Sequence, residues 1–135
     1  MPWTCRKCKR SFVARPKEHS CVKLAAADHL EGKPENLLEI YHRLEAVFSG
    51  FGDYRVEAVK TALYFKKLST FAGIVFRKDH LRLEFFLDHE EDVFPVEKIV
   101  HYSKNRIVHT VSLSSVAEID RQLLSWLKES YRLTR

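Results

Sequence analysis

The sequence predicts an α+β fold: a mostly antiparallel sheet of five or six strands, flanked by an N-terminal and a C-terminal helix and preceded by a small zinc-binding module. Apolar residues recur every three or four positions before residue 50 and again after residue 115, and they alternate at every second position in between. All three cysteines fall within the first 24 residues. We therefore expect a module over 1–24, a polar linker over 25–33 and a domain over 34–135.

The first helix is expected directly after Pro34. A proline in the first turn and Gly50 after the last turn are typical of helix ends. Between them the apolar residues lie at helical spacing and form one stripe: Leu37, Leu38, Tyr41, Leu44, Val47 and Phe48. This helix therefore has one face suited to a core.

The central part of the chain predicts strands, because runs of β-branched and aromatic residues alternate with polar ones. The expected strands are Tyr54–Val59, Ala62–Phe65, Phe71–Arg77, Leu81–Leu87, Ile99–Tyr102 and Ile107–Leu113. Phe86 breaks the alternation of its strand, which suggests that the outer face there is partly covered. The short links 78–80 and 103–105 leave room only for hairpin turns and favour an antiparallel meander.

The last segment predicts a second helix. Ser115 stands three residues before Glu118, which is the spacing of a capping box. An apolar stripe follows: Ile119, Leu123, Trp126, Leu127 and Tyr131. We expect both helices to cover the same face of the sheet.

Charge is distributed unevenly over the 135 residues. Residues 1–24 hold seven basic side chains and one acidic one, a net charge of +6, whereas residues 25–135 hold 16 basic and 17 acidic ones, a net charge of −1. No apolar run approaches the roughly 20 residues that span a bilayer, and no leader pattern is visible. Three cysteines are an odd number for a disulfide framework. We therefore expect a cytoplasmic protein with reduced thiols.

Four residues of the first segment form a candidate metal site. Cys5 and Cys8 have the Cys-x-x-Cys spacing that lets one tight turn present two thiolates to a single ion, and His19 and Cys21 follow. Zinc binds such sets tetrahedrally, and a shell closed by four protein ligands is structural. The alternatives are ordinary reduced cysteines, His29 in place of His19, and iron in place of zinc.

These motifs resemble a bacterial family whose main part is the domain of unknown function 5655. The resemblance rests on Trp3, Cys5, Cys8, Arg10, Phe12, His19-Ser-Cys21 and Asp28-His29-Leu30-x-Gly32-Lys33, then on Val59-Lys60-Thr61, Phe65, Phe71-Ala72, His80-Leu81, His109, Asp120, Trp126-Leu127 and Tyr131. It covers nearly the whole chain and implies a zinc-ribbon-like element before an α+β domain, with no established reaction. The sequence departs from the family at Lys9, where relatives usually have Gly.

The first functional hypothesis is a non-enzymatic binding protein. Its basic module would contact the phosphates of a nucleic acid, or an acidic protein, through Arg6, Lys7, Lys9, Arg10 and Arg15. No membrane partner is expected.

Two other classes of function stay open. His109 shares the alternation of an apolar strand, which is typical of a core histidine. It would also suit a small-molecule-binding or enzymatic domain, with a pocket for an anionic small molecule lined by Lys60, Lys66 and Tyr102. A structural adaptor that presents a sheet or helix face to a partner is the third class. The acidic run 88–92, which includes His89, lacks the spacing of a calcium loop and predicts a solvated loop.

Overall fold

A computed structural model describes residues 3–4, 11–12 and 26–135. Its helices are α1 (Ala26–Leu30), α2 (Glu35–Phe51) and α3 (Arg121–Leu133), with a 3₁₀ turn at Val116–Glu118. Its strands are β1 (Trp3–Thr4), β2 (Ser11–Phe12), β3 (Arg55–Ala58), β4 (Leu63–Lys66), β5 (Thr70–Phe76), β6 (Leu81–Leu87), β7 (Lys98–Ser103) and β8 (Arg106–Leu113).

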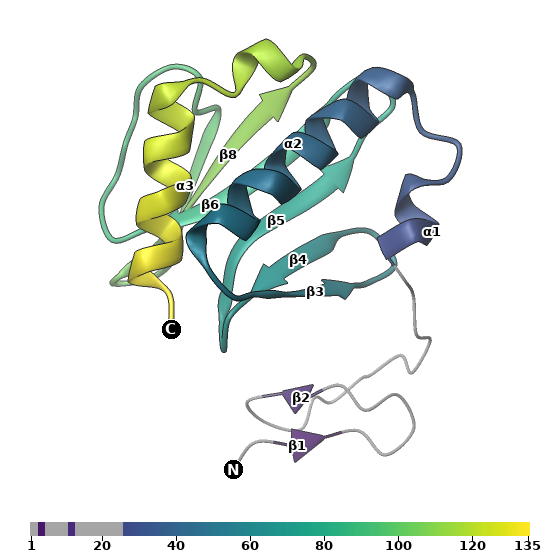
Figure 1. Cartoon of the computed structure of the whole chain (residues 1–135). Helices are drawn as coiled ribbons and strands as arrows, with labels where there is room; N and C mark the ends of the chain where they lie inside the picture. Colours follow the sequence, from purple (N-terminus) through teal and green to yellow (C-terminus); the bar gives the residue numbers. More distant parts are fainter. Residues whose placement is uncertain (1–2, 5–10, 13–25) are drawn as a thin grey trace.

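Strands β3 to β8 form one sheet in which every neighbouring pair is antiparallel, as the sequence predicts. The order is β3-β4-β5-β6-β8-β7, so the sheet is not the simple meander that the short links favour. The chain leaves β6 through residues 88–97, forms β7 at the edge, and returns as β8 between them (Figure 1). The link between β6 and β7 is long enough for this step, whereas the link between β7 and β8 is a tight turn.

Helices α2 and α3 lie over the same face of the sheet, as Figure 1 shows. The core between helices and sheet contains fully buried residues of all layers, among them Leu44 and Phe48 of α2, Phe65 and Phe85 of the sheet, and Leu123 of α3. The inward residues are the alternate ones of the strands, which is clearest in β6, where every second residue from Leu81 to Leu87 is buried. The predicted helix–strands–helix order is therefore confirmed.

The segment expected to be a linker contains helix α1 instead. The partly buried Leu30 packs against the core, and His29 Nε2 donates a hydrogen bond to the Val59 carbonyl oxygen at 2.6 Å. The helix was missed because its five residues are too short to show an apolar period. Residues 26–33 thus belong to the domain.

Ser115 and Glu118 both make capping hydrogen bonds, but these are not the pair of a capping box, and they cap a different element from the one expected. Ser115 Oγ accepts from the Ala117 N–H at 3.2 Å, and the Glu118 carboxylate accepts from the Ser114 N–H at 2.8 Å. These bonds enclose only the 3₁₀ turn, and α3 begins afterwards with its own cap, since the Asp120 carboxylate accepts from the Leu123 N–H at 2.9 Å.

Within the described ranges, no helix is long and apolar enough to cross a membrane.

Candidate functional site

The face of the sheet opposite the helices carries a cavity, and it forms where β5 and β6 separate. Their pairing ends at Ala72 and Phe85, although both strands continue. The buried Ser130 of α3 lies at the end of the pairing: its hydroxyl donates to the Phe71 carbonyl at 2.7 Å and accepts from the Phe86 N–H at 3.0 Å. One side chain thus takes the place of the next direct bond between the strands, so their backbone groups stay satisfied as they part.

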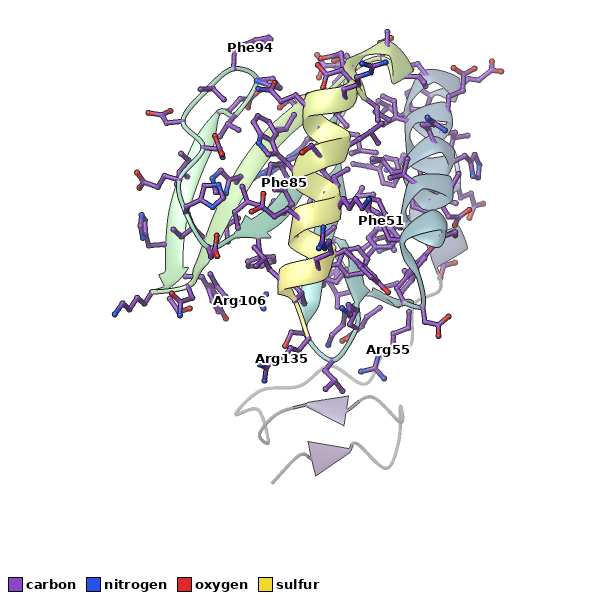
Figure 2. All side chains as sticks on the ribbon, turned by 60° about the vertical axis from the view of Figure 1, so that its left-hand side comes forward. Phe51, Arg55, Phe85, Phe94, Arg106 and Arg135 are labelled. Atoms are coloured by element: carbon purple, nitrogen blue, oxygen red, sulfur yellow. The ribbon has the colours of Figure 1, made fainter. Side chains whose placement is uncertain are left out.

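Arg106, the first residue of β8, reaches across this separation. Its guanidinium lies over the Phe86 ring, with Cζ 4.1 Å from the ring centroid, and Nη2 donates to the Thr70 carbonyl oxygen at 2.7 Å. The side chain therefore extends from β8 over β6 to β5. Figure 2 labels Arg106 toward the same end of the domain as Arg135, the last residue.

The cavity has a volume of about 560 Å³. It is lined by Tyr64, Lys66, Leu68, Ser69, Thr70, Glu84, Phe86, Tyr102, Arg106 and Val108. These residues come from β4, the β4–β5 link, β5, β6, β7 and β8, so only the folded sheet assembles the cavity.

Aromatic rings form much of its wall. Phe86 and Tyr102 meet edge to face with centroids 6.4 Å apart, and Tyr102 is 76% exposed. Tyr64 packs closely against Gly73, because a Cβ added at Gly73 would lie 3.2 Å from the ring atoms Cδ1 and Cε1. The glycine thus leaves room for the Tyr64 ring on the surface of the sheet.

On this face Lys66 and Arg82 are each neutralised by a carboxylate, whereas Arg106 is not. Lys66 Nζ lies 2.9 Å from Glu57, and an Arg82 nitrogen lies 3.1 Å from Glu84. Arg106 has no carboxylate within ion-pair distance among the described residues, and its recorded hydrogen bond is to a neutral carbonyl. Burial lowers the pKa of Arg106, but a guanidinium stays charged in proteins. The cavity therefore combines a desolvated positive charge with ring faces, which suits a ligand that is both anionic and planar.

The structure does not bring Lys60, Lys66 and His109 into one pocket. Lys60 is exposed in the β3–β4 turn, whereas Lys66 lies at the opposite end of β4, on the face of the sheet away from the helices. His109 is buried on the face that the helices cover. Lys66 and Tyr102 do meet, in the cavity described above. The break in alternation at Phe86 was the one sequence signal for this cavity. No sequence pattern predicts Arg106 as a residue of the cavity, because its position beside Phe86 and Thr70 depends on the strand order.

Both ring nitrogens of His109 have fixed partners. Nε2 accepts from the Glu91 N–H at 2.9 Å, and Nδ1 donates to the Ile107 carbonyl at 3.0 Å. Only the neutral tautomer with its proton on Nδ1 satisfies both, since an amide can only donate and a carbonyl can only accept here. Burial lowers the pKa of His109, and the ring stacks on Phe85 at 5.4 Å. His109 is thus a core residue that holds the 88–97 loop against the sheet.

The acidic run around His89 is a loop, and its side chains contact one another and helix α3. His89 Nδ1 lies 2.7 Å from Asp88 and 4.0 Å from Glu129 of α3, and Nε2 lies 2.9 Å from Glu91. Hydrogen bonds to Asp88 and Glu91 raise the pKa of His89. One potential ligand atom each from Asp88, His89 and Glu129 lies within 4.8 Å of the others. Such exposed groups commonly occur without an ion, and these three are fully explained as a link between the loop and α3.

The other candidate residues lie outside the described part of the chain. They are the predicted metal ligands Cys5, Cys8, His19 and Cys21 and the basic residues Arg6, Lys7, Lys9, Arg10 and Arg15. Of the neighbouring segments, β1 and β2 are described, and they pair antiparallel with Trp3 opposite Phe12.

Comparison with known proteins identifies a family that covers most of the chain. A family model described as a domain of unknown function (DUF5655) matches residues 26–134. The matched range includes α1 and every strand of the large sheet. No curated protein and no solved structure matches the chain.

Proposed function

The chain belongs to the family of the domain of unknown function (DUF5655), a membership that brings no reaction with it, and from that premise we propose a non-enzymatic protein that binds single-stranded nucleic acid. The observation that carries the proposal is Arg106, a partly buried guanidinium without a carboxylate partner, beside the exposed ring of Tyr102. Nucleic acid supplies both a phosphate and a planar base.

The geometry suggests how each part of a nucleotide would be held. A phosphate oxygen would replace part of the hydration that Arg106 loses on burial, through donors that the Thr70 carbonyl leaves free. A base would stack on Tyr102, since every base has a ring face and an exposed aromatic on an open antiparallel sheet is a common platform for single strands. The cavity lacks a Gly-rich phosphate loop or a nucleophile next to a base, so binding is favoured over catalysis.

The N-terminal module would supply the long-range attraction. We assign Cys5, Cys8, His19 and Cys21 to one structural zinc ion, and the spacing Cys-x-x-Cys falls between β1 and β2, where zinc modules commonly carry such pairs. The thiolates require a reducing compartment, which supports a cytoplasmic location. The net charge of +6 over residues 1–24 favours phosphate contacts, through Arg6, Lys7, Lys9, Arg10 and Arg15.

Fluorescence anisotropy with a labelled single-stranded oligonucleotide tests the proposal on the full-length protein. We expect binding at low salt that weakens as salt is added, because phosphate contacts release counterions. Tyr102→Ala should weaken it roughly fivefold or more, the effect of losing one stacked base. Arg106→Gln should weaken it for every oligonucleotide sequence, because a phosphate carries no sequence information.

Matched variants control for surface changes elsewhere. Phe94→Ala removes another exposed aromatic, 90% exposed and outside the cavity, and Arg43→Gln removes an exposed cation of α2. Both should bind like the wild type. The proposal fails if no binding appears at low salt, or if the cavity variants and the controls behave alike. Equal competition by polyglutamate would favour an acidic protein as the partner instead.

A further inference from the structure

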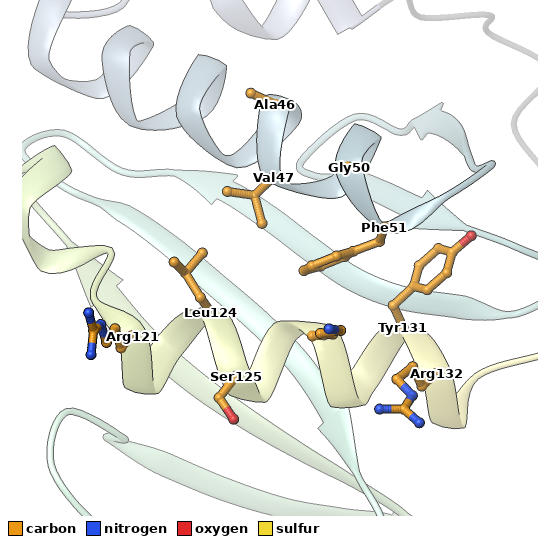
Figure 3. A pocket seen from close by; sticks show the side chains of 10 residues that line it. Ala46, Val47, Gly50, Phe51, Arg121, Leu124, Ser125, Tyr131 and Arg132 are labelled. Atoms are coloured by element: carbon orange, nitrogen blue, oxygen red, sulfur yellow. The ribbon is translucent and has the colours of Figure 1, made fainter.

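A second surface lies on the far side of the sheet from the cavity, in the groove between α2 and α3. The groove has a volume of about 770 Å³ (Figure 3). Its apolar floor consists of partly buried side chains from both helices: Val47, Phe51, Leu124 and Tyr131. Phe51 and Tyr131 contact each other with ring centroids 5.7 Å apart and close the groove at one end.

Small residues on the α2 side leave the groove open to solvent. Ala46 and Gly50 lie four positions apart, so they share a face of the helix. A Cβ added at Gly50 would meet no atom within 4 Å, which shows that the space beside it is open. A glycine inside a helix costs about 0.5–1 kcal/mol relative to alanine, and no close packing in the structure requires it here.

The α3 side of the groove carries a row of positive charge. Arg121, Lys128 and Arg132 are exposed and are spaced by seven and four residues, which places them along one side of the helix. Figure 3 shows Arg121 and Arg132 at opposite ends of this row. Within residues 26–135, no carboxylate is recorded in an ion pair with any of the three. The row spans roughly 16 Å at 1.5 Å per residue.

We infer that this groove binds an acidic amphipathic helix of a partner protein. An apolar stripe at helical spacing fits the floor, and carboxylates beside that stripe reach the row of cations. A small molecule with one carboxylate engages one cation only, whereas a helix presents acidic groups over the full length of the row. The domain as a whole has a net charge of −1 from residue 25 on, so the row is a local feature and not part of a general excess.

A designed peptide tests this inference with the full-length protein. The probe is a fluorescent helical peptide with leucines at positions i, i+3, i+4 and i+7 and glutamates on both flanks of that stripe. We expect saturable binding that the triple variant R121Q/K128Q/R132Q weakens about tenfold, from the loss of three exposed ion pairs. Gly50→Leu should abolish binding by filling the groove from α2.

The controls keep charge and fold constant. The triple variant K60Q/K78Q/K104Q removes the same charge from exposed positions outside the groove and should bind like the wild type. A peptide with glutamine for glutamate should bind at least tenfold more weakly. Circular dichroism identifies any variant that fails to fold, and Gly50→Ala then serves as the milder obstruction, with a smaller loss expected.

Three results would overturn the inference. The first is no peptide binding at low salt, and the second is equal binding by the two triple variants. The third is a change from dimer to monomer in R121Q/K128Q/R132Q by sedimentation, which would assign the groove to a second copy of this chain. Because the peptide assay contains no nucleic acid, failure of the proposed function leaves it unaffected.

Discussion

His109 shows at the level of one residue how burial fixes a protonation state. Its folded-state pKa is lowered, so as pH falls below the ordinary value of 6.5 the unfolded chain takes up a proton before the folded chain does. The contribution of His109 to the free energy of unfolding is therefore fully present above pH 6.5 and declines as pH falls from 6.5 toward the lowered folded-state pKa. Urea titrations at a series of pH values should show this loss of stability on acidification.

Replacing His109 by glutamine separates titration from packing. His109→Gln keeps an acceptor for the Glu91 N–H but has no proton to gain, so it should be less stable at neutral pH and show a flatter pH dependence. Ser125→Ala changes an exposed side chain of α3 that does not titrate and should keep the wild-type slope. Identical slopes in all three proteins would contradict the assigned role of His109.

At the level of elements, Ser130 connects α3 to two strands. Ser130→Ala leaves the Phe71 carbonyl and the Phe86 N–H without their shared partner. We expect the free energy of unfolding to fall by about 1–3 kcal/mol, the cost of leaving buried polar groups unsatisfied. Chemical denaturation measures the change. Ser125→Ala, at an exposed position of the same helix, should stay within about 0.5 kcal/mol of the wild type. A loss of similar size in both variants would mean that the hydroxyl bridge is not the cause.

Element by element, local patterns were enough to predict the helices α2 and α3 and the six strands of the sheet. The strand order was not predictable in the same way, because β7 and β8 both have the composition of strands and local pattern does not decide which of them pairs with β6. The cavity depends on that order: Arg106 reaches Thr70 only because β8 lies beside β6. The sequence groups Lys60, Lys66 and His109 by residue type alone. In the structure Lys60 and Lys66 lie beyond and at opposite ends of β4, and His109 of β8 lies on the other face of the sheet from Lys66.

For the whole molecule, the uneven charge and the separate cysteine segment predict two independently stabilised parts. Elemental analysis of protein purified without a metal-binding tag should give one zinc per chain. Cys8→Ser should lose it, because three ligands no longer close the tetrahedral shell. In the wild-type protein a chelator should remove the zinc. The thermal unfolding of the 26–135 domain should stay unchanged, since that domain has its own core.

His89→Ala provides the control for the metal prediction. It disrupts the Asp88, His89 and Glu129 group but none of the four assigned ligands, so the zinc content should stay at one per chain. A zinc content near zero in the reduced wild-type protein, or a loss of zinc in His89→Ala alone, would contradict the assignment.

The strand order also has a consequence for how the chain folds. β7 precedes β8 in sequence, yet in the finished sheet it pairs with β8 alone, at the edge. The two are joined by a tight turn, so they can pair first as a hairpin, a step that takes about 1–10 μs. That hairpin then joins β6 through β8, its second strand, and β7 becomes the edge of the sheet. In pulsed hydrogen exchange, the amides of β7 should become protected together with those of β8 and never before them.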